Sequence, residues 1–188
     1  TVANAQAAPI LQQTAPVSTT YTFGFLQDLT VAAGTGFGDV TAALSPVDLN
    51  LSSPSSNTSG CETADFAGFS AGTIALVQRS VGTCAFSVKV ANAVAAGASG
   101  VLLFNQGGNP PDLLTQSAID VFVGSSPSAV PVFFASFAVG QSLALPSGVI
   151  VRMKVTPDDL VPVPEPKSVA LLALGFAGIV ARRVRRRA

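Results

Sequence analysis

The stretch GTIALVQRSVGTCAFSVKVANAVAAGASGVLLF, residues 72–104, decides the fold of this chain. Residues 73–77 form a short continuous apolar run next to Gly72, which is typical of a buried strand. Residues 101–104 form a second run of the same kind after Gly100. The segment between the two runs has helical periodicity. The stretch therefore predicts a βαβ unit with two parallel strands and a right-handed crossover.

The predicted helix of this unit has one apolar face. Its members recur at helical spacing and are Phe86, Val90, Ala93 and Val94. Gly97 follows at the position where a glycine commonly ends a helix. Lys89 and Asn92 lie off this face, so we expect both side chains to be solvated.

Outside the unit, the pattern predicts short strands at residues 20–25, 121–123, 130–134 and 149–156 and a loop at 50–60. It also predicts a short helix through Leu143 that Ser136 caps. Residues 149–156 alternate apolar and polar side chains, which predicts a half-exposed strand at a sheet edge. The fold class is therefore α/β and rich in strands, with one domain over 20–157. Prolines make residues 158–167 a stiff linker.

The C-terminal end has the order of a sorting signal. Pro164, Glu165 and Pro166 precede an apolar run over 169–181 and five arginines within 182–187. A helix of these 13 apolar residues is ~20 Å long, which is short for a bilayer core of ~30 Å. Arginines mark the cytoplasmic side. Residues 168–188 therefore predict a temporary membrane anchor with an Arg-rich cytoplasmic tail; an ordinary tail anchor is the alternative.

This order resembles the PEP-CTERM sorting signal of Gram-negative bacteria that make extracellular polysaccharide. The resemblance implies recognition by an exosortase, a membrane-embedded cysteine transpeptidase that cleaves near Pro164-Glu165-Pro166. The protein would be anchored transiently in the inner membrane and then reach the cell surface or the extracellular matrix. At the other end, small residues at Ala3, Ala5 and Ala7 resemble a signal-peptidase site. We expect residues 1–19 to be a signal-peptide remnant or a disordered N-terminus.

Charge and composition exclude several classes of function. Up to Ala181 the chain has five basic and ten acidic residues, a net charge of about −5, which argues against nucleic acid as a partner. Histidine is absent, which removes Ser-His-Asp and Cys-His nucleophiles and His-based zinc proteases. We predict no catalytic residue, cofactor or metal site. Ten carboxylates leave a carboxylate-dependent hydrolase as an open alternative.

The two cysteines are Cys61 and Cys84. In an exported protein an isolated pair predicts one disulfide, and a loop of this length contributes about 3 kcal/mol on chain-entropy grounds. A metal pair is one alternative, but it needs two more ligands, typically histidines. A nucleophilic cysteine is the other.

The core of the chain resembles the protease-associated, or PA, domain. The resemblance rests on residues 61–66, 72–79, 84–86, 89, 92–93, 96–101, 130–132 and 140–143. It departs from the family pattern at Ser80 and Val81, which separate Arg79 from Gly82. The resemblance implies a β/β/α sandwich with few helices and a non-catalytic role. PA domains occur as lids or inserts in secreted peptidases and as ligand-binding parts of sorting receptors, and they are thought to bind protein segments.

A candidate ligand groove follows from long polar loops at 105–118 and 120–130, because binding residues concentrate in such loops. Its expected residues are Arg79, Asn105, Gln106, Asn109 and Asp112. Arg79 could instead pair with a carboxylate such as Asp65 and fix the end of its strand. Three functions remain: an exported non-catalytic module that binds polypeptide or matrix material, an accessory subunit of a separate secreted peptidase, and the hydrolase.

Overall fold

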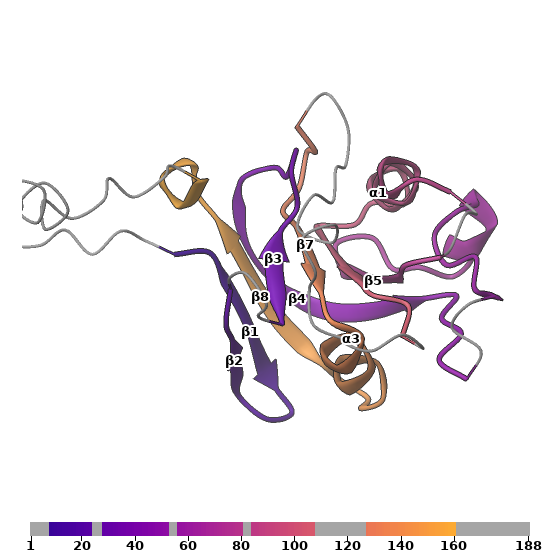
Figure 1. Ribbon diagram of the computed structural model, residues 1–188, viewed down its shortest axis with the longest axis horizontal. Coiled ribbons are helices and arrows are strands. Elements are labelled where there is room, and N and C mark those ends of the chain that lie inside the picture. Colours follow the sequence, from indigo (N-terminus) through magenta and orange to yellow (C-terminus); the bar gives the residue numbers. More distant parts are fainter. Residues whose placement is uncertain (1–7, 24–27, 53–55, 81–83, 108–126, 161–188) are drawn as a thin grey trace, which may run out of the picture. The chain divides into compact units, whose positions relative to one another are not determined.

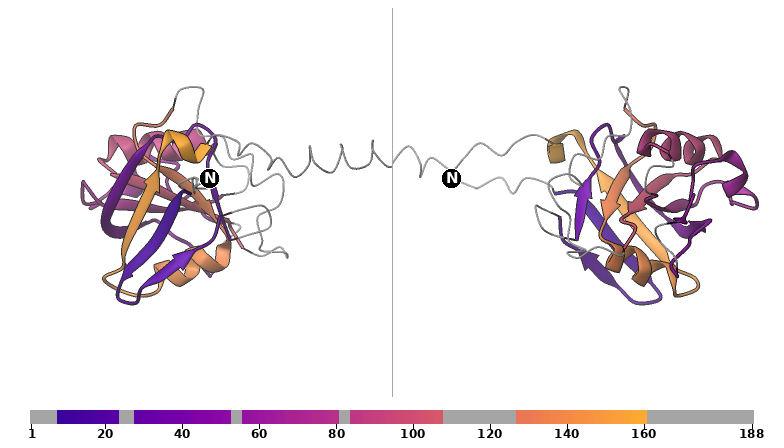
Figure 2. Two further views of the ribbon diagram at one scale, coloured as in Figure 1. Left: turned by 90° about the vertical axis from the view of Figure 1, so that its left-hand side faces the viewer. Right: turned by 45° about the vertical axis from the view of Figure 1, so that its right-hand side comes forward.

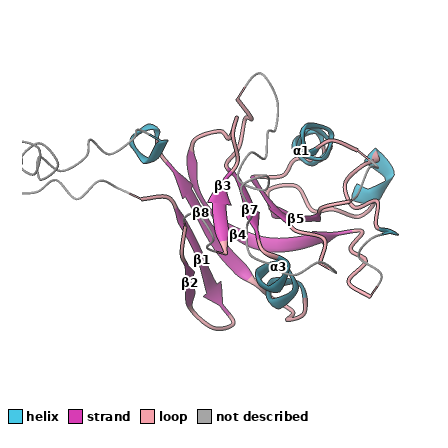
Figure 3. Ribbon diagram, viewed as in Figure 1, coloured by secondary structure: helices cyan, strands magenta, loops and turns pink. Residues whose placement is uncertain are grey.

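The computed structural model describes residues 8–23, 28–52, 56–80, 84–107 and 127–160, and Figure 1 shows how they are arranged. The strands are β1 (Ile10–Ala15), β2 (Thr19–Tyr21), β3 (Leu29–Val31), β4 (Gly38–Val47), β5 (Ile74–Gln78), β6 (Gly100–Phe104), β7 (Val132–Ala135) and β8 (Ile150–Val155). The helices are α1 (Phe86–Ala95) and α3 (Phe137–Ala144), with short 3-10 turns η2 (Thr63–Phe66) and η3 (Pro157–Leu160). Strands clearly outweigh helices in the described residues, as Figure 3 shows, and the fold class is β-rich α/β.

Within the described ranges, the eight strands form one sheet with the order β2-β1-β8-β4-β5-β6-β7-β3. The predicted βαβ unit is confirmed, because β5 and β6 are parallel neighbours joined by α1. β4 and β7 extend this parallel region on either side. Every residue of β5, β6 and β7 is buried. These strands read as continuous apolar runs because both faces of the sheet are covered.

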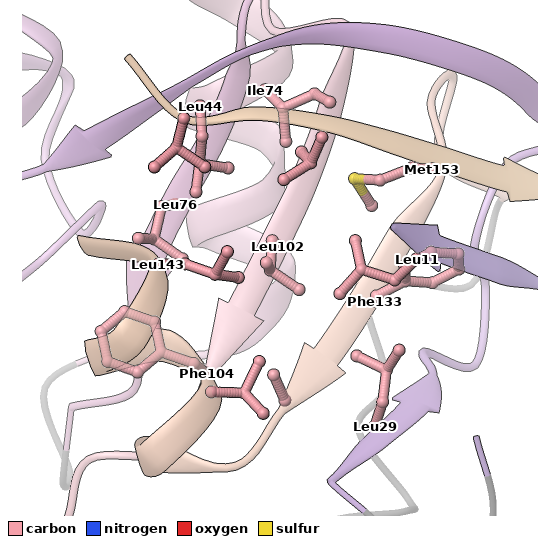
Figure 4. Packing of buried hydrophobic residues seen from close by; sticks show 14 of the residues in the cluster. Leu11, Leu29, Leu44, Ile74, Leu76, Leu102, Phe104, Phe133, Leu143 and Met153 are labelled. Atoms are coloured by element: carbon pink, nitrogen blue, oxygen red, sulfur yellow. The ribbon is translucent and has the colours of Figure 1, made fainter. Parts of the chain in front are cut away.

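The two faces of the parallel strands form two separate cores. Ala75, Val77, Val101, Leu103 and Phe134 face α1, together with Phe66 of η2. The alternate residues face α3 and the strands β1 and β8, and Figure 4 shows part of this second cluster, including Ile74, Leu76, Leu102, Phe104 and Phe133. In Figures 1 and 2, α1 and α3 accordingly lie on opposite sides of the parallel strands.

The end of α1 and the start of α3 lie where the sequence predicts them. Gly97 has a positive φ of 87°, its N–H donates to the carbonyl of Val94, and the next N–H, of Ala98, donates to Ala93. This pair of bonds is the Schellman motif, which favours glycine because it requires a left-handed backbone. At the start of α3, the Ser136 side chain accepts a hydrogen bond from the Val139 N–H at 3.3 Å.

The predicted position of β8 at a sheet edge is wrong. Its alternation is real, since Val151, Met153 and Val155 are buried and the residues between them are more exposed. However, β8 pairs with β1 on one side and with β4 on the other. Alternation reports that one face is more exposed than the other, and it carries no information about whether both edges are paired.

The predicted start of the domain at residue 20 is also too late. β1 pairs with β8, and Leu11 is fully buried opposite Met153. β2 then pairs with β1, so residues 10–21 belong to the sheet. An isolated bridge from Phe23 to Leu29 links the chain after β2 to β3 at the opposite end of the strand order. This contact places Phe23, two residues after the end of β2, beside the first residue of β3.

Several expected features fall outside the described residues. They are the strand at 121–123, Asn109, Asp112, the sorting motif and the apolar run at 169–181. Within the part of the chain that the structure describes, no helix has both the length and the apolar character needed to cross a membrane.

Candidate functional site

Three of the five predicted groove residues meet at the carboxyl ends of the parallel strands. Arg79 directly follows β5, and Asn105 and Gln106 directly follow β6. Because β5 and β6 are adjacent and parallel, the residues after them lie at the same edge of the sheet, where open α/β sheets commonly bind ligands. The Arg79 Nη1 atom donates to Asn105 Oδ1 at 3.3 Å, and the Gln106 N–H donates to the same oxygen at 2.9 Å.

Gln78, the last residue of β5, connects the chain segments beside this cluster, and the sequence analysis did not identify it. The side chain is fully buried. Its Oε1 accepts from the Asn50 N–H at 2.9 Å, and its Nε2 donates to the carbonyls of Asn50 at 3.3 Å and Gln106 at 3.4 Å. One amide thus joins the chain segments that follow β4, β5 and β6. The available signal was a polar residue that ends an apolar strand, since a buried amide needs partners.

The guanidinium of Arg79 does not pair with a carboxylate among the described residues. The expected alternative partner, Asp65, instead accepts a hydrogen bond from the Glu62 N–H at 3.0 Å. The salt bridge observed among the described residues joins Arg152 and Asp39 at 2.7 Å. Arg79 is half-buried, and its backbone is fixed by the Asn57 side chain, which donates to the Arg79 carbonyl at 2.7 Å. The cluster therefore presents a positioned cation with donor groups left over, which suits a carboxylate or a carbonyl.

Lys89 is buried and Asn92 is half-buried, whereas both were expected to be solvated. Lys89 is 1% exposed, and its ammonium donates to the carbonyls of Ser59 and Gln78. Asn92 Nδ2 donates to the carbonyls of Gly60 at 3.1 Å and Cys61 at 3.0 Å. Both side chains therefore hold the turn at residues 59–61 against α1. The helical periodicity could not reveal this, because the accepting carbonyls lie outside the helix, 11 to 32 positions away in the chain.

Burial also changes the protonation chemistry of Lys89. Loss of hydration lowers the pKa of its ammonium to about 8, and the negative charge of Asp65 opposes this shift. The expected disulfide between Cys61 and Cys84 is present, and Cys61 Sγ lies 3.5 Å from the Lys89 Nζ. The two residues of the PA pattern that appeared to be surface groups are thus part of a buried polar contact beside the disulfide.

A separate shallow hollow of ≈ 250 Å³ lies between residues 44–47 of β4 and the turn at 65–70. Its lining includes Ser45, Asp65, Phe69 and Ser70, and none of the three groove residues that the structure describes. The predicted groove and this hollow are therefore distinct features.

Comparison with known proteins agrees with the motif assignments. The sequence matches the family model of the PA domain over residues 40–143 and that of the PEP-CTERM protein-sorting motif over residues 162–187. The sorting motif implies an exported, extracytoplasmic protein of a Gram-negative bacterium. Over 131 residues, the chain is 47% identical to proteins named aminopeptidase from Pseudomonas aeruginosa strains UCBPP-PA14 and PAO1. The match covers 69% of this chain but only 23% of each aminopeptidase.

Solved structures show the same fold. The aminopeptidase from Aneurinibacillus sp. strain AM-1 aligns with a TM-score of 0.56 and 24% identity over 80% of this chain and 31% of its own. BSAP, a zinc aminopeptidase from Bacillus subtilis, aligns with a TM-score of 0.54 and 19% identity over 79% of this chain and 31% of its own. The chain thus spans less than a third of these proteins. With more than half of its residues matched by the family model, the chain belongs to the PA domain family.

Proposed function

We propose that this protein is a non-catalytic binding module that is exported, processed at its PEP-CTERM motif, and binds polypeptide or matrix material at the cell surface. The observation that carries the proposal is the Arg79–Asn105–Gln106 cluster at the carboxyl edge of the parallel strands. The guanidinium is held by neutral groups and has no contacting carboxylate among the described residues, so it is free to bind one from a ligand. The similarity to aminopeptidases is confined to 23% of their length, which supports a role outside the reaction itself.

Binding can be tested with a defined probe. An array of short peptides that differ in acidic side chains and in a free or amidated C-terminus should show preferential retention of the carboxylate-bearing members. We expect Arg79→Ala to weaken their binding by about tenfold or more, since a charge-assisted hydrogen bond contributes about 1.5–3 kcal/mol. Arg152→Ala is the matched control, because it removes an equal charge from an exposed ion pair on β8. Equal binding by wild type and Arg79→Ala would place the ligand elsewhere.

Sorting is tested separately from binding. We expect Glu165→Gln to leave an unprocessed precursor in the membrane fraction, and Glu62→Gln, an exposed change in the body, to be processed normally. The readout is the size and location of the protein on immunoblots of fractionated cells. Normal release of the Glu165→Gln variant would contradict the role of the motif.

An accessory role for a separate peptidase is a second candidate, because the region of 47% identity belongs to proteins named aminopeptidase. It predicts that the purified chain co-sediments with a secreted aminopeptidase of the same cells and changes its kcat/KM. No such favourable observation supports the hydrolase alternative. Asp39 is paired with Arg152, which lowers the pKa of its carboxyl group, and Asp65 accepts a backbone hydrogen bond.

A further inference from the structure

The two sulfurs of the disulfide have different electrostatic surroundings. Cys61 Sγ lies 3.5 Å from the Lys89 ammonium and 3.6 Å from the Ser80 hydroxyl. Both neighbours are buried, Lys89 at 1% and Ser80 at 7% exposure. Among the described residues, no donor contacts Cys84 Sγ. Cys61 Sγ therefore has two hydrogen-bond donors directed at it, from Lys89 and Ser80, and neither of them contacts Cys84 Sγ.

Among the residues that the structure describes, the ammonium of Lys89 also has no contacting anion. Its three donors reach two backbone carbonyls, of Ser59 and Gln78, and the Cys61 sulfur. Asp65 is the charged group whose field acts on it, but no salt bridge joins the two residues. A buried cation is costly unless it is paired. A negative charge on Cys61 would supply the missing partner at the distance already present.

We propose that the Cys61–Cys84 disulfide is an exchangeable bond, in which Cys61 is the sulfur that departs as a thiolate stabilised by Lys89 and Ser80. The reductant is a dithiol, either a small molecule or a thioredoxin-like protein. One dithiol sulfur attacks Cys84 Sγ as a thiolate, the Cys61–Cys84 bond breaks, and Cys61 Sγ takes the electron pair. The second thiol, as its thiolate, then attacks the sulfur of the first and releases Cys84. The protein gains two electrons and one proton, which Cys84 binds while Cys61 stays a thiolate. The dithiol becomes a disulfide, and its other proton goes to solvent. Exchange is faster when the leaving sulfur forms the more stable thiolate.

The fold does not depend on this bond alone. Lys89 and Asn92 of α1 make four hydrogen bonds to backbone carbonyls, and three of these carbonyls belong to the turn at residues 59–61. One of these carbonyls belongs to Gln78 at the end of β5, so the turn, the helix and the strand remain connected after reduction. We therefore expect reduction to leave a folded domain that carries one stabilised thiolate.

The test uses the full chain reduced with dithiothreitol. The rate of alkylation by iodoacetamide is measured for each cysteine by peptide mass spectrometry across pH 5–10, because only the thiolate reacts. The pH midpoint, unlike the absolute rate, does not depend on accessibility. We expect the midpoint for Cys61 to lie at least one pH unit below that for Cys84. In a second arm, the oxidised protein is treated briefly with glutathione and quenched in acid, and we expect the mixed disulfide on Cys84.

Variants identify the cause. Lys89→Met should raise the Cys61 midpoint by a unit or more, and Ser80→Ala should raise it by less. Lys154→Met, which removes an equal charge from β8, should leave it unchanged. If Lys89→Met does not fold, the proposal is still tested by the difference between the two cysteine midpoints in wild type and by the Cys61 midpoint in Ser80→Ala. Equal midpoints for the two cysteines in wild type, glutathione found on Cys61, or a Cys61 midpoint unchanged by Ser80→Ala would each overturn the proposal.

Discussion

At the scale of single residues, the buried position of Lys89 determines both its hydrogen bonds and its pKa. Lys89 belongs to α1, its hydrocarbon stem lies close to Gly60, and its ammonium reaches the backbone of a turn and of a strand end. Lysine suits this position because its long stem can be buried among apolar groups while the charged end finds acceptors. The same burial lowers the pKa of the ammonium to about 8, which makes the stability of the domain depend on pH.

The direction of this dependence follows from the pKa difference. An unfolded lysine has a pKa near its ordinary value of 10.5, whereas the folded value is about 8. Between these values the unfolded state binds more protons, so the free energy of unfolding should rise with pH from about 8 upward. Urea unfolding of the oxidised protein at intervals between pH 7 and 9.5 measures this rise. It should disappear in Lys89→Met and persist in Lys154→Met; a rise of equal size in Lys89→Met would exclude Lys89 as its source.

At the scale of elements, α3 packs so closely on the sheet that its glycine is required. A Cβ atom added at Gly140 would lie 2.1 Å from the Phe104 ring, which is itself fully buried. The phenyl group has no space to move into, because it belongs to the cluster between α3 and the sheet. Phe104 therefore ends β6 with a ring that covers the backbone of α3.

This contact predicts a reversal of the usual helix preference. Alanine in place of glycine normally stabilises a helix by about 0.5–1 kcal/mol, but Gly140→Ala should destabilise the domain by roughly 1–3 kcal/mol through overpacking. Ala138→Gly on the exposed side of the same helix should cost only about 1 kcal/mol. Chemical denaturation of both variants gives the comparison. Stabilisation by Gly140→Ala would mean that α3 does not pack against Phe104 as described.

The position of β8 between two paired strands gives a second prediction, which concerns hydrogen exchange. Because β8 pairs on both sides, its amides should be among the slowest to exchange with deuterium, close to the limit set by global unfolding. Amides of β2, at one end of the strand order, should exchange faster. Hydrogen-exchange mass spectrometry of peptides covering 149–156 and 18–22 measures the difference. Similar fast exchange in both peptides would indicate that β8 is not flanked by two strands.

At the scale of the whole molecule, the sheet depends on the N-terminal segment. Leu11 fills the second core together with Leu29, Phe133 and Met153, and β1 occupies one full edge of β8. The Phe23 ring packs edge-on against Phe133 with centroids 5.0 Å apart, which ties the segment after β2 to β7. Removal of residues 8–19 would open the β8 edge and expose part of this core.

We therefore expect a chain that begins at Thr20 to fold poorly and to aggregate, whereas one that begins at Ala8 folds cooperatively. Loss of the buried Leu11 side chain alone should cost about 2–5 kcal/mol, and the unpaired β8 edge adds a tendency to associate. Circular dichroism during thermal unfolding and size-exclusion chromatography give the readouts. Cooperative unfolding of the chain from Thr20 at an unchanged midpoint would show that β1 and β2 are dispensable.

The sequence predicted the parts of the fold that depend on near neighbours. The βαβ unit, the glycine end of α1, the Ser136 cap and the alternation within β8 are all encoded within a few residues of where they act. The cysteine pair was predicted because only two cysteines exist, and the structure contains the bond. The groove prediction rested on long polar loops. Arg79, Asn105 and Gln106 lie together because the parallel strands β5 and β6 end at a common edge, and ligand binding by them stays a prediction.

Only the tertiary structure decided which segments meet across long distances in the chain. It placed β8 between β1 and β4, brought Ile10–Ala15 into the sheet, and buried Lys89 against carbonyls at Ser59 and Gln78. Local patterns report how much of a side chain tends to be buried, but a strand edge and a buried ammonium are defined by their partners. Those partners are chosen by packing of the whole chain, because the cost of an unpaired polar group is removed wherever an acceptor is brought within reach.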